Sequence, residues 1–454
     1  MTTALVIAGH GSLISPNTAA PAWRHADAIR ALGYFDEVTC AFWKEAPALH
    51  RVLDTLNADE ITIVPLFTSQ GYFTKVVLPA ELGLDGALTR RDGRTICYTE
   101  PIGQHPHMTA VVRDRVEAVL ARYKLDPAQT ALALAGHGTR RDADSARATQ
   151  RQADIMKAQG RFAEVVAIYI EEPPEIESVY RITSSRNVIV VPFFVADGPH
   201  TQQDIPTALQ LGADTDGAGY PVPANVQGRD VYYTPAVGLE PSVANVILDL
   251  AQAAGASLKS PSVANQPWGG FPLVGLETLR KMQFPFQFGQ VQIDQQGNSY
   301  RLHHIDDSVP NQVMDSPGAL REFLNFAPDG NFRPLRTTSN MPPHWVVEVN
   351  SLEAVLAALE TIYPTAWVDF ARQREGKLPI QTLEQVTARQ TGIYRRLGQL
   401  SPSAISELVS SVCGTCVRTP IWDQHEAQES AVPCPEACQL WMNAALEHLE
   451  SLRV

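Results

Sequence analysis

Short runs of apolar, β-branched residues alternate with amphipathic stretches over the first part of the chain, as far as Ala251. The runs are ALVIAG, EVTCAFW, EITIVPLFT and RTICYT, followed by TALALAG, EVVAIYI, NVIVVPFF and DVYYT. Continuous apolar runs of this length are typical of parallel strands that are covered on both faces. Helical patterns such as APALHRVLDTLN and SARATQRQADIMKAQG lie between them. This alternation predicts βαβ units, a parallel sheet and therefore an α/β fold.

The pattern of strands and helices occurs twice. LVIAGHGS at residues 5–12 returns as LALAGHGT at residues 132–139, so that His10 and His137 occupy matching positions (137 − 10 = 127). YTEPIG and YTPAVG match with a larger offset (233 − 98 = 135), which an insertion rich in Gly, Pro and Asp between Pro206 and Tyr233 explains. The repeats predict two tandem, doubly wound parallel-sheet domains, at residues 1–125 and 126–255. Ligands usually bind such sheets at the carboxyl ends of the strands.

In both copies Gly-His-Gly directly follows a buried strand, which places His10 and His137 at the carboxyl end of a sheet. A histidine in this position is, taken singly, more often structural than catalytic. The second copy also has His200 after another strand, and Glu171 and Glu172 after a third. Two neutral imidazoles and a carboxylate suit a borderline divalent cation. We expect His137 and His200 to bind a metal ion with Glu172 nearby, the alternative for Glu172 being a capping or orienting role.

The first copy differs at the matching positions. Phe73 occupies the position of His200, and Val77 that of Asp204. We therefore expect the second copy to hold the metal and the first mainly to complete the cleft. His10 is a candidate for substrate contact or for proton acceptance.

The repeat pattern ends after Ala251 in a linker-like stretch, QAAGASLKSPSVANQPWGG. We expect a small α+β domain at residues 270–365, with a hairpin that turns at Gly297-Asn298. Its helix EAVLAALETIY has Asn350 and Glu353 in capping-box spacing. A helical domain is expected at residues 366–454, with a helix that starts at Ser401-Pro402.

Four of the six cysteines are clustered near the C-terminus, between positions 413 and 438. Cys413-x2-Cys416 and Cys434-x3-Cys438 offer two pairs of thiolates, a soft tetrahedral set that suits a [4Fe–4S] cluster or a structural zinc ion. The wider second pair favours iron–sulfur. Trp422 and Trp441 are close in sequence, either to shield a cluster or to fill a core.

Composition narrows the range of partners. Hydrophobic residues make up 44% and charged residues 19% of the 454 residues, as in an ordinary globular protein. The net charge of -13 argues against a nucleic-acid or anionic-membrane partner. The sequence has neither a membrane-spanning run nor a signal-peptide pattern, so a cytoplasmic location is expected. The oligomeric state stays open.

The stretches AGHGS, VPLF, VPFF, GPHTQQDIP and PIGQHP together resemble the sirohydrochlorin cobaltochelatase family, which are ATP-independent class II chelatases related in fold to ferrochelatase. The resemblance implies insertion of Co2+, or alternatively Fe2+ or Ni2+, into sirohydrochlorin in cobalamin- or sirohaem-type biosynthesis. It also implies metal binding by His137 and His200, and metal or proton handling by Glu172. In many long members the histidine pair lies in the first half, where this chain has Phe73.

A sirohydrochlorin-like tetrapyrrole carries carboxylates that need hydrogen-bond donors. Candidates are the backbone N–H groups after Ser12 and Thr139, with Arg140 and Arg141 nearby. The alternative for the arginines is solvated surface charge.

YPTAWVDFARQ and ARQTGIYRR, together with the cysteine pairs, resemble the iron–sulfur extension of some chelatases of this family, which implies a [4Fe–4S] cluster with zinc as the alternative. Three functions stay open. The first is a metal chelatase, the second an iron–sulfur redox protein that acts on a bound tetrapyrrole, and the third a non-catalytic carrier of metal or tetrapyrrole.

Overall fold

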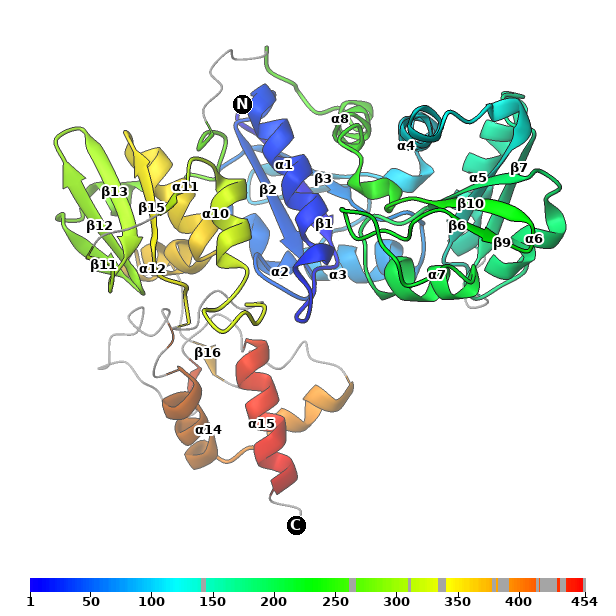
Figure 1. The fold of residues 1–454 in the computed structure, drawn as a ribbon. Coiled ribbons are helices and arrows are strands. Elements are labelled where there is room, and N and C mark those ends of the chain that lie inside the picture. The colour runs from blue at the N-terminus through cyan, green and yellow to red at the C-terminus, as the bar shows by residue number, and fades with distance from the viewer. Residues whose placement is uncertain are drawn as a thin grey trace. The chain divides into compact units, whose positions relative to one another are not determined.

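The computed structural model describes residues 1–139, 144–260, 267–308, 312–333, 340–377, 381–382, 392–413, 416, 431–432 and 438–451 (Figure 1). The chain divides into two compact units, residues 1–265 (unit 1) and residues 266–454 (unit 2). None of the helices in these ranges combines the length and the apolar character that a membrane span requires.

Unit 1 contains two five-stranded sheets with the same strand order, β2-β1-β3-β5-β4 and β7-β6-β8-β10-β9. In each sheet four strands are parallel and the last edge strand is antiparallel. The first sheet comprises β1 (Thr3–Gly9), β2 (Glu37–Phe42), β3 (Glu60–Pro65), β4 (Leu88–Arg91) and β5 (Arg94–Tyr98), and the second β6 (Thr130–Gly136), β7 (Glu164–Tyr169), β8 (Asn187–Pro192), β9 (Ala224–Val226) and β10 (Arg229–Tyr233). The predicted duplication of a parallel α/β sheet is confirmed.

The central strand β1 is buried on both faces, which explains its unbroken apolar sequence. Leu5 and Ile7 point into one hydrophobic core. Ala4, Val6 and Ala8 point into another core on the opposite face. The two-residue period of a strand thus divides one apolar run between two layers of helices.

The helices of unit 1 are α1 (Ala20–Leu32), α2 (Leu49–Val52), α3 (Leu78–Leu82), α4 (Met108–Tyr123), α5 (Asp144–Ala158), α6 (Val179–Ile182), α7 (Ile205–Ala208) and α8 (Val243–Ala253). A π-helix precedes α3 at Phe73–Val77, and another precedes α7 at His200–Asp204. Because the two π-helices start at matched positions (200 − 73 = 127), the backbone feature is common to both copies.

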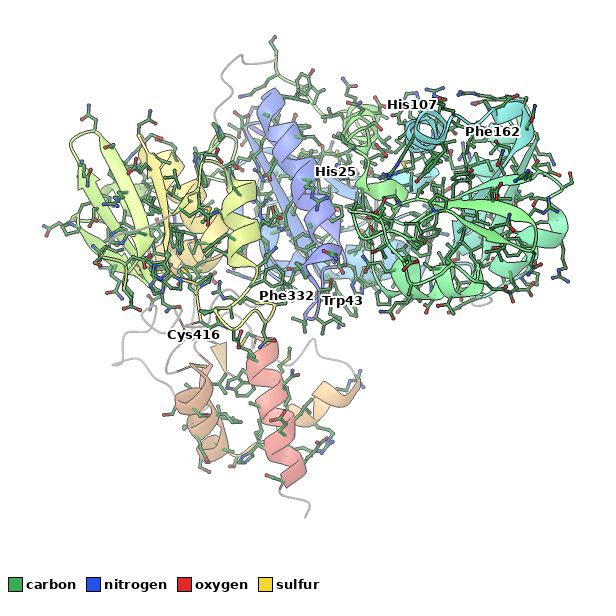
Figure 2. All side chains as sticks on the ribbon, viewed as in Figure 1. His25, Trp43, His107, Phe162, Phe332 and Cys416 are labelled. Carbon is green, nitrogen blue, oxygen red and sulfur yellow. The ribbon has the colours of Figure 1, made fainter. Side chains whose placement is uncertain are left out.

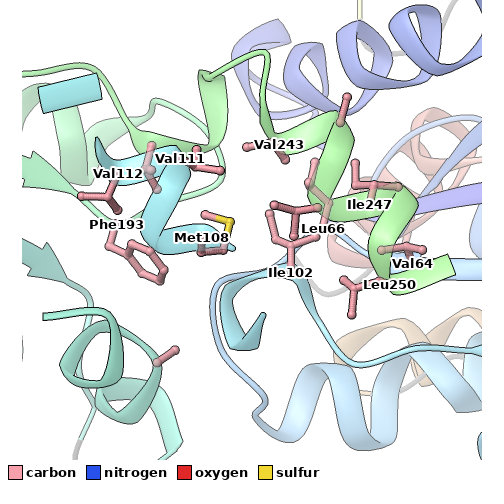
Figure 3. Close-up of a cluster of buried hydrophobic side chains, with 14 of the residues drawn as sticks. Val64, Leu66, Ile102, Met108, Val111, Val112, Phe193, Val243, Ile247 and Leu250 are labelled. Atoms are coloured by element: carbon pink, nitrogen blue, oxygen red, sulfur yellow. The ribbon is translucent and has the colours of Figure 1, made fainter. Parts of the chain in front are cut away.

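Two long helices are exchanged between the copies. α4 follows the first sheet in sequence but packs on β8 and α5 of the second copy, whereas α8 packs on β3 and α1 of the first copy. Figure 3 shows the resulting core, in which Val64, Leu66 and Ile102 lie near Val243, Ile247 and Leu250, and Met108, Val111 and Val112 lie near Phe193. This continuous core makes the two copies one compact unit. Whether residues 1–125 and 126–255 are separate domains stays a prediction.

Unit 2 begins with a mixed five-stranded sheet of order β11-β12-β13-β15-β14. Its elements are α9 (Leu276–Arg280), β11 (Phe286–Phe288), β12 (Val291–Gln296), β13 (Ser299–His304), β14 (Gln312–Val313), α10 (Pro317–Leu324), β15 (Trp345–Val349), α11 (Leu352–Ile362) and α12 (Ala366–Arg374). The predicted hairpin joins β12 and β13 at Gly297-Asn298. The capping box predicted from Asn350 is wrong by one residue, because Ser351 is the N-cap and its hydroxyl accepts the N–H of Ala354 at 3.2 Å.

Trp367 and Phe370 of α12 pack into the core of this sheet, so α12 belongs with the α+β region. The following segment contains a short ladder of β16 (Gln381–Thr382) and β17 (Ala431–Val432), a 3-10 helix (Gly392–Gln399), α14 (Pro402–Leu408) and α15 (Gln439–Ser451). Ser401 caps α14 by accepting the N–H of Ala404 at 3.2 Å, which confirms the predicted helix start. The predicted fold class, α/β copies followed by an α+β region and a helical segment, is confirmed.

Candidate functional site

The histidines of the two Gly-His-Gly turns come directly after the last residues of β1 and β6. Gly11 and Gly138 in these turns have positive φ values of 67° and 61°, a conformation that favours glycine. A Cβ atom at Gly138 would lie 2.9 Å from Oε1 of Glu172, and one at Gly11 would lie 3.0 Å from Oε1 of Glu45. Each turn therefore needs glycine both for its backbone and for the glutamate packed beneath it.

His137 and His200 lie together, as the sequence predicts. Their ring centroids are 5.0 Å apart and the rings are nearly perpendicular, at 85°. His137 lies in the turn after β6, while His200 begins the π-helix after β8. Both side chains are partly exposed, at 38% and 46%, so an ion from solvent can reach them.

The Nδ1 atoms of both histidines are occupied by hydrogen bonds. Nδ1 of His137 lies 2.7 Å from the carbonyl oxygen of Gly138, and Nδ1 of His200 lies 2.6 Å from Oδ2 of Asp204. Because a carbonyl or carboxylate oxygen can only accept, Nδ1 carries the hydrogen in each ring. In the neutral imidazoles this leaves the lone pair of Nε2 for a metal ion. Asp204 has the place of the carboxylate that commonly orients a metal-binding histidine.

Of the two adjacent glutamates, Glu171 has its carboxylate beside the histidine pair. Its Oε1 lies 3.9 Å from Nε2 of His137. Oε1 of Glu172 is instead buried beneath Gly138, without a hydrogen-bond partner among the described residues. Both glutamates are candidates from the sequence, because both follow the same strand. In the structure the backbone after β7 leaves Glu171 exposed and packs Glu172 against the turn. The role predicted for Glu172 stays a prediction.

The matching site in the first copy is aromatic. His10 has the same Nδ1 contact, 2.8 Å from the carbonyl oxygen of Gly11. Its ring packs 5.7 Å from Phe73 and 5.3 Å from Trp43, and Trp43 and Phe73 are 5.2 Å apart. Nζ of Lys44 lies 3.7 Å from the centre of the Trp43 ring. Figure 2 labels Trp43, which is 40% exposed. We call these four residues, His10, Trp43, Lys44 and Phe73, the aromatic site.

The candidate hydrogen-bond donors for substrate carboxylates either have other hydrogen-bond partners or lie outside the described residues. The hydroxyl of Ser12 accepts the N–H groups of Ile14 and Ser15, at 3.1 and 3.2 Å. The N–H of Ser12 itself donates to Glu45 at 2.9 Å. Arg140 and Arg141 lie outside the described residues. The contacts of Ser12, Ile14 and Ser15 therefore add no support for anion binding at the turn after β1.

Three of the four clustered cysteines are described and lie close together in unit 2. Cys413 ends the π-helix Val409–Cys413, Cys438 precedes α15, and the N–H of Cys416 donates to the carbonyl of Cys413 at 3.0 Å. Burial, together with the thiols of Cys438 and Cys416, raises the pKa of the Cys413 thiol to about 12. Cys434 and Trp422 lie outside the described residues.

This donor set fits an iron–sulfur cluster. A buried thiol with a raised pKa, such as that of Cys413, becomes a thiolate only beside positive charge, which the iron ions of a bound cluster would supply. Trp441, 1% exposed, and Met442 complete the surrounding core, so the indole fills the interior. Figure 2 labels Cys416 near this core.

Family models match most of the chain. A model described as CbiX matches residues 4–119 and 131–254, which together are more than half of the 454 residues. The DR2241 stabilising domain matches residues 276–374. A 4Fe-4S iron-sulfur cluster binding domain matches residues 375–447, whereas the zinc alternative has no such support.

Individual proteins are similar to the same regions. A probable sirohydrochlorin cobaltochelatase from Halobacterium salinarum is 43% identical over 270 residues, 56% of this chain and 92% of that protein. A sirohydrochlorin cobaltochelatase from Methanopyrus kandleri is 30% identical over 134 residues, 26% of this chain and 92% of that protein. The crystal structure of DR2241 from Deinococcus radiodurans, a multi-domain protein with structural similarity to chelatases and two additional novel domains, matches 99% of both chains with a TM-score of 0.80 and 25% identity.

Proposed function

Because the chain belongs to the CbiX family, we propose that it inserts a divalent metal ion into sirohydrochlorin without ATP. The observation that carries the proposal is the pairing of His137 and His200 at 5.0 Å between ring centroids, with both Nδ1 atoms engaged elsewhere. Co2+ is the favoured substrate metal because two relatives are named cobaltochelatases. Imidazole nitrogen suits Fe2+ and Ni2+ as well.

In this proposal His137 and His200 bind the incoming metal ion through Nε2 and leave its other positions open. Two protein ligands hold the ion weakly enough to surrender it to the four nitrogens of the macrocycle. The hydrogen bond from His200 to Asp204 fixes the ring and raises its basicity. The carboxylate of Glu171, 3.9 Å from Nε2 of His137, adds negative charge where the cation enters.

Insertion of one divalent ion releases two pyrrole protons, so the site also needs proton acceptors. Glu171 is half exposed and adjacent to the metal ligands, which makes it the first candidate. Glu172 has a buried oxygen without a hydrogen-bond partner among the described residues, and it is the second. His10 is the third, since its Nε2 is left open by the Nδ1 contact to Gly11.

The aromatic site of the first copy offers a surface for the macrocycle. The rings of Trp43 and Phe73 provide flat apolar area, and the ammonium group of Lys44 lies over Trp43. A tetrapyrrole combines an apolar ring system with peripheral carboxylates, so such a site matches both of its parts. We propose that the first copy binds substrate and the second binds the metal ion.

The experiment is insertion of Co2+ into sirohydrochlorin by the purified full chain, followed by the change in the visible spectrum. His137→Ala should reduce the rate by more than the roughly 10- to 100-fold that loss of an outer-shell partner costs, because it removes a ligand itself. A parallel measurement of bound cobalt provides the matched control. His10→Ala should keep the cobalt stoichiometry of the unmodified chain, whereas His137→Ala should lower it. Equal rates for His137→Ala and the unmodified chain would refute the proposal. Tetrapyrrole binding without turnover would instead indicate a carrier.

The alternative function, a redox protein that acts on a bound tetrapyrrole, rests only on the match of residues 375–447 to a 4Fe-4S iron-sulfur cluster binding domain. When bound, a [4Fe–4S] cluster supplies one-electron chemistry. The residues placed to hold it are Cys413, Cys416 and Cys438, with Cys434 from the sequence pattern. Cys413→Ser should remove the brown colour and leave cobalt insertion intact. Reduction of bound sirohydrochlorin that is lost in Cys413→Ser, in a chain that inserts no cobalt, would favour the redox function.

A further inference from the structure

A second group of side chains that could hold a metal ion lies in unit 1 and shares no residue with the histidine pair. His105, His107 and Asp249 offer one ligand atom each, and these atoms all lie within 4.8 Å of one another. His107 and Trp43, which marks the aromatic site, lie well apart in Figure 2. Two imidazoles and a carboxylate form the ligand set that borderline divalent cations prefer.

The three residues lie at the start of one exchanged helix, α4, and within the other, α8. His105 and His107 lie between the 3-10 helix Ile102–Gln104 and α4, and His107 is the N-cap residue of α4. Asp249 lies on α8, far along the chain from both histidines. A bound ion would therefore link the start of α4 to α8, where the two copies interlock.

Hydrogen bonds from the buried side chain of Gln152 fix the backbone that carries the two histidines. The buried side chain of Gln152 donates to the carbonyl oxygens of His105 at 3.2 Å and of Gly103 at 3.4 Å. Its own Oε1 accepts the hydroxyl of Thr109 at 2.5 Å. Gly103 packs so tightly that a Cβ atom there would lie 1.9 Å from the carbonyl oxygen of Thr68. The two imidazoles thus project from a fixed turn, which reduces the entropy lost on binding.

The side chains already face one another and remain open to solvent. Nδ1 of His107 lies 2.6 Å from Oδ2 of Asp249, and the rings of His105 and His107 are 4.9 Å apart at 84°. The side chain of His107 is 66% exposed and that of Asp249 is 35% exposed. An ion can therefore enter without any part of the core opening.

The duplication provides an internal comparison. The offset that relates YTEPIG to YTPAVG (233 − 98 = 135) matches His105 with Glu240 and Asp249 with Asp114, at the other crossing of the exchanged helices. There Arg115 bridges the elements, with Nε 2.8 Å from Oε1 of Glu240 and a second nitrogen donating to the carbonyl of Ala236 at 3.2 Å. The residue that matches Arg115 is Leu250, which is buried. One crossing thus carries a built-in cation, and the other carries imidazoles and a carboxylate.

We propose that His105, His107 and Asp249 form a second binding site for a borderline divalent cation such as Zn2+ or Co2+, which clamps α4 to α8. The ion takes the position that the guanidinium group of Arg115 has at the matching crossing. This site is separate from the site where His137 and His200 bind the substrate metal, and it does not depend on that function.

The test uses the untagged full chain with His137→Ala and His200→Ala, which removes the first site, and Co2+ alone as the probe. Equilibrium dialysis with iron counted separately should find one equivalent of Co2+ per chain. Adding His107→Ala, or separately Asp249→Asn, should remove that equivalent. Asp114→Asn, the matched carboxylate at the other crossing, should retain it.

A second readout is thermal unfolding in the same background. Co2+ at 100 times its Kd should raise Tm by roughly 5 °C or more, and His107→Ala should abolish the rise. Because His107 is exposed, this variant is expected to fold. Absence of a bound equivalent in the double variant, or its persistence after both His107→Ala and Asp249→Asn, would overturn the proposal.

Discussion

The two copies of the sheet have the same backbone devices but different side chains around their histidines. Each has a Gly-His-Gly turn after its central strand, with Nδ1 held by the next carbonyl, and each has a π-helix after its third strand. His200 is replaced by Phe73, Asp204 by Val77, Glu171 by Lys44 and Ile170 by Trp43. His137 and Glu172 have the same residue types in the first copy, His10 and Glu45, whereas His200, Asp204 and Glu171 have apolar or cationic counterparts there.

This difference teaches that the backbone alone does not create a metal site here. The same strand order, turn and π-helix hold imidazoles with a carboxylate in one copy and packed aromatic rings in the other. A duplicated fold can therefore divide one task, with metal bound in one copy and the macrocycle in the other. Three changes would break or sharpen this contrast.

The largest expected effect is the creation of a metal site in the aromatic copy. Phe73→His with Val77→Asp, made in a chain with His200→Ala and His107→Ala, restores the histidine pair and its orienting carboxylate beside His10. We expect one new equivalent of bound Co2+. It should bind up to roughly a thousandfold more weakly than the original site, because Lys44 stands in place of Glu171 and this exchange of charge about 4 Å from a divalent ion costs on the order of 4 kcal/mol even in water.

Equilibrium dialysis measures this gain. Phe73→His alone is the control and should bind less tightly, since its imidazole lacks the orienting carboxylate. The variant with both substitutions could instead stay folded and bind no cobalt. That result would mean that the backbones of the two copies differ at this site although their π-helices match. The division of tasks would then lie in the backbone as well.

A smaller effect is expected from Asp204, which contacts the proposed metal ligand His200 in the second copy. Asp204→Asn removes the negative charge that accepts Nδ1–H of His200 at 2.6 Å. Loss of such a partner typically costs about 10- to 100-fold in metal affinity or activity. The rate of cobalt insertion under limiting Co2+ should fall accordingly, and Gln202→Asn, on the same π-helix, should leave it unchanged. A rate for Asp204→Asn equal to that of the unmodified chain would remove Asp204 from the proposed site.

Much of this contrast could be predicted from the sequence, because the repeats align residue by residue. The approach of His137 and His200 followed from their positions at the ends of two strands of one parallel sheet. The sequence did not predict that Glu171, and not Glu172, has its carboxylate beside His137. The two glutamates are adjacent after β7, but one side chain faces the histidine pair and the other packs beneath Gly138.

The exchange of α4 and α8 also escaped prediction. An amphipathic helix shows that it covers a sheet, but its sequence does not say which of two similar sheets it covers. For the same reason the group of His105, His107 and Asp249 was not foreseen. Asp249 becomes their neighbour only because α8 returns to the first copy. The available signal was the pair of histidines in PIGQHPH, without an identified partner.

The smallest expected effect concerns the aromatic copy in its native form. Trp43→Ala removes a 40% exposed ring that contacts His10 and Phe73. Aromatic contacts contribute about 0.5–1.5 kcal/mol beyond buried area, so KM for sirohydrochlorin should rise roughly 2- to 10-fold with unchanged cobalt stoichiometry. The matched change Ile170→Ala, beside the histidine pair, should alter KM less. If both changes raised KM equally, the macrocycle would rest on both copies, and the division of tasks between them would fail for the tetrapyrrole while holding for the metal.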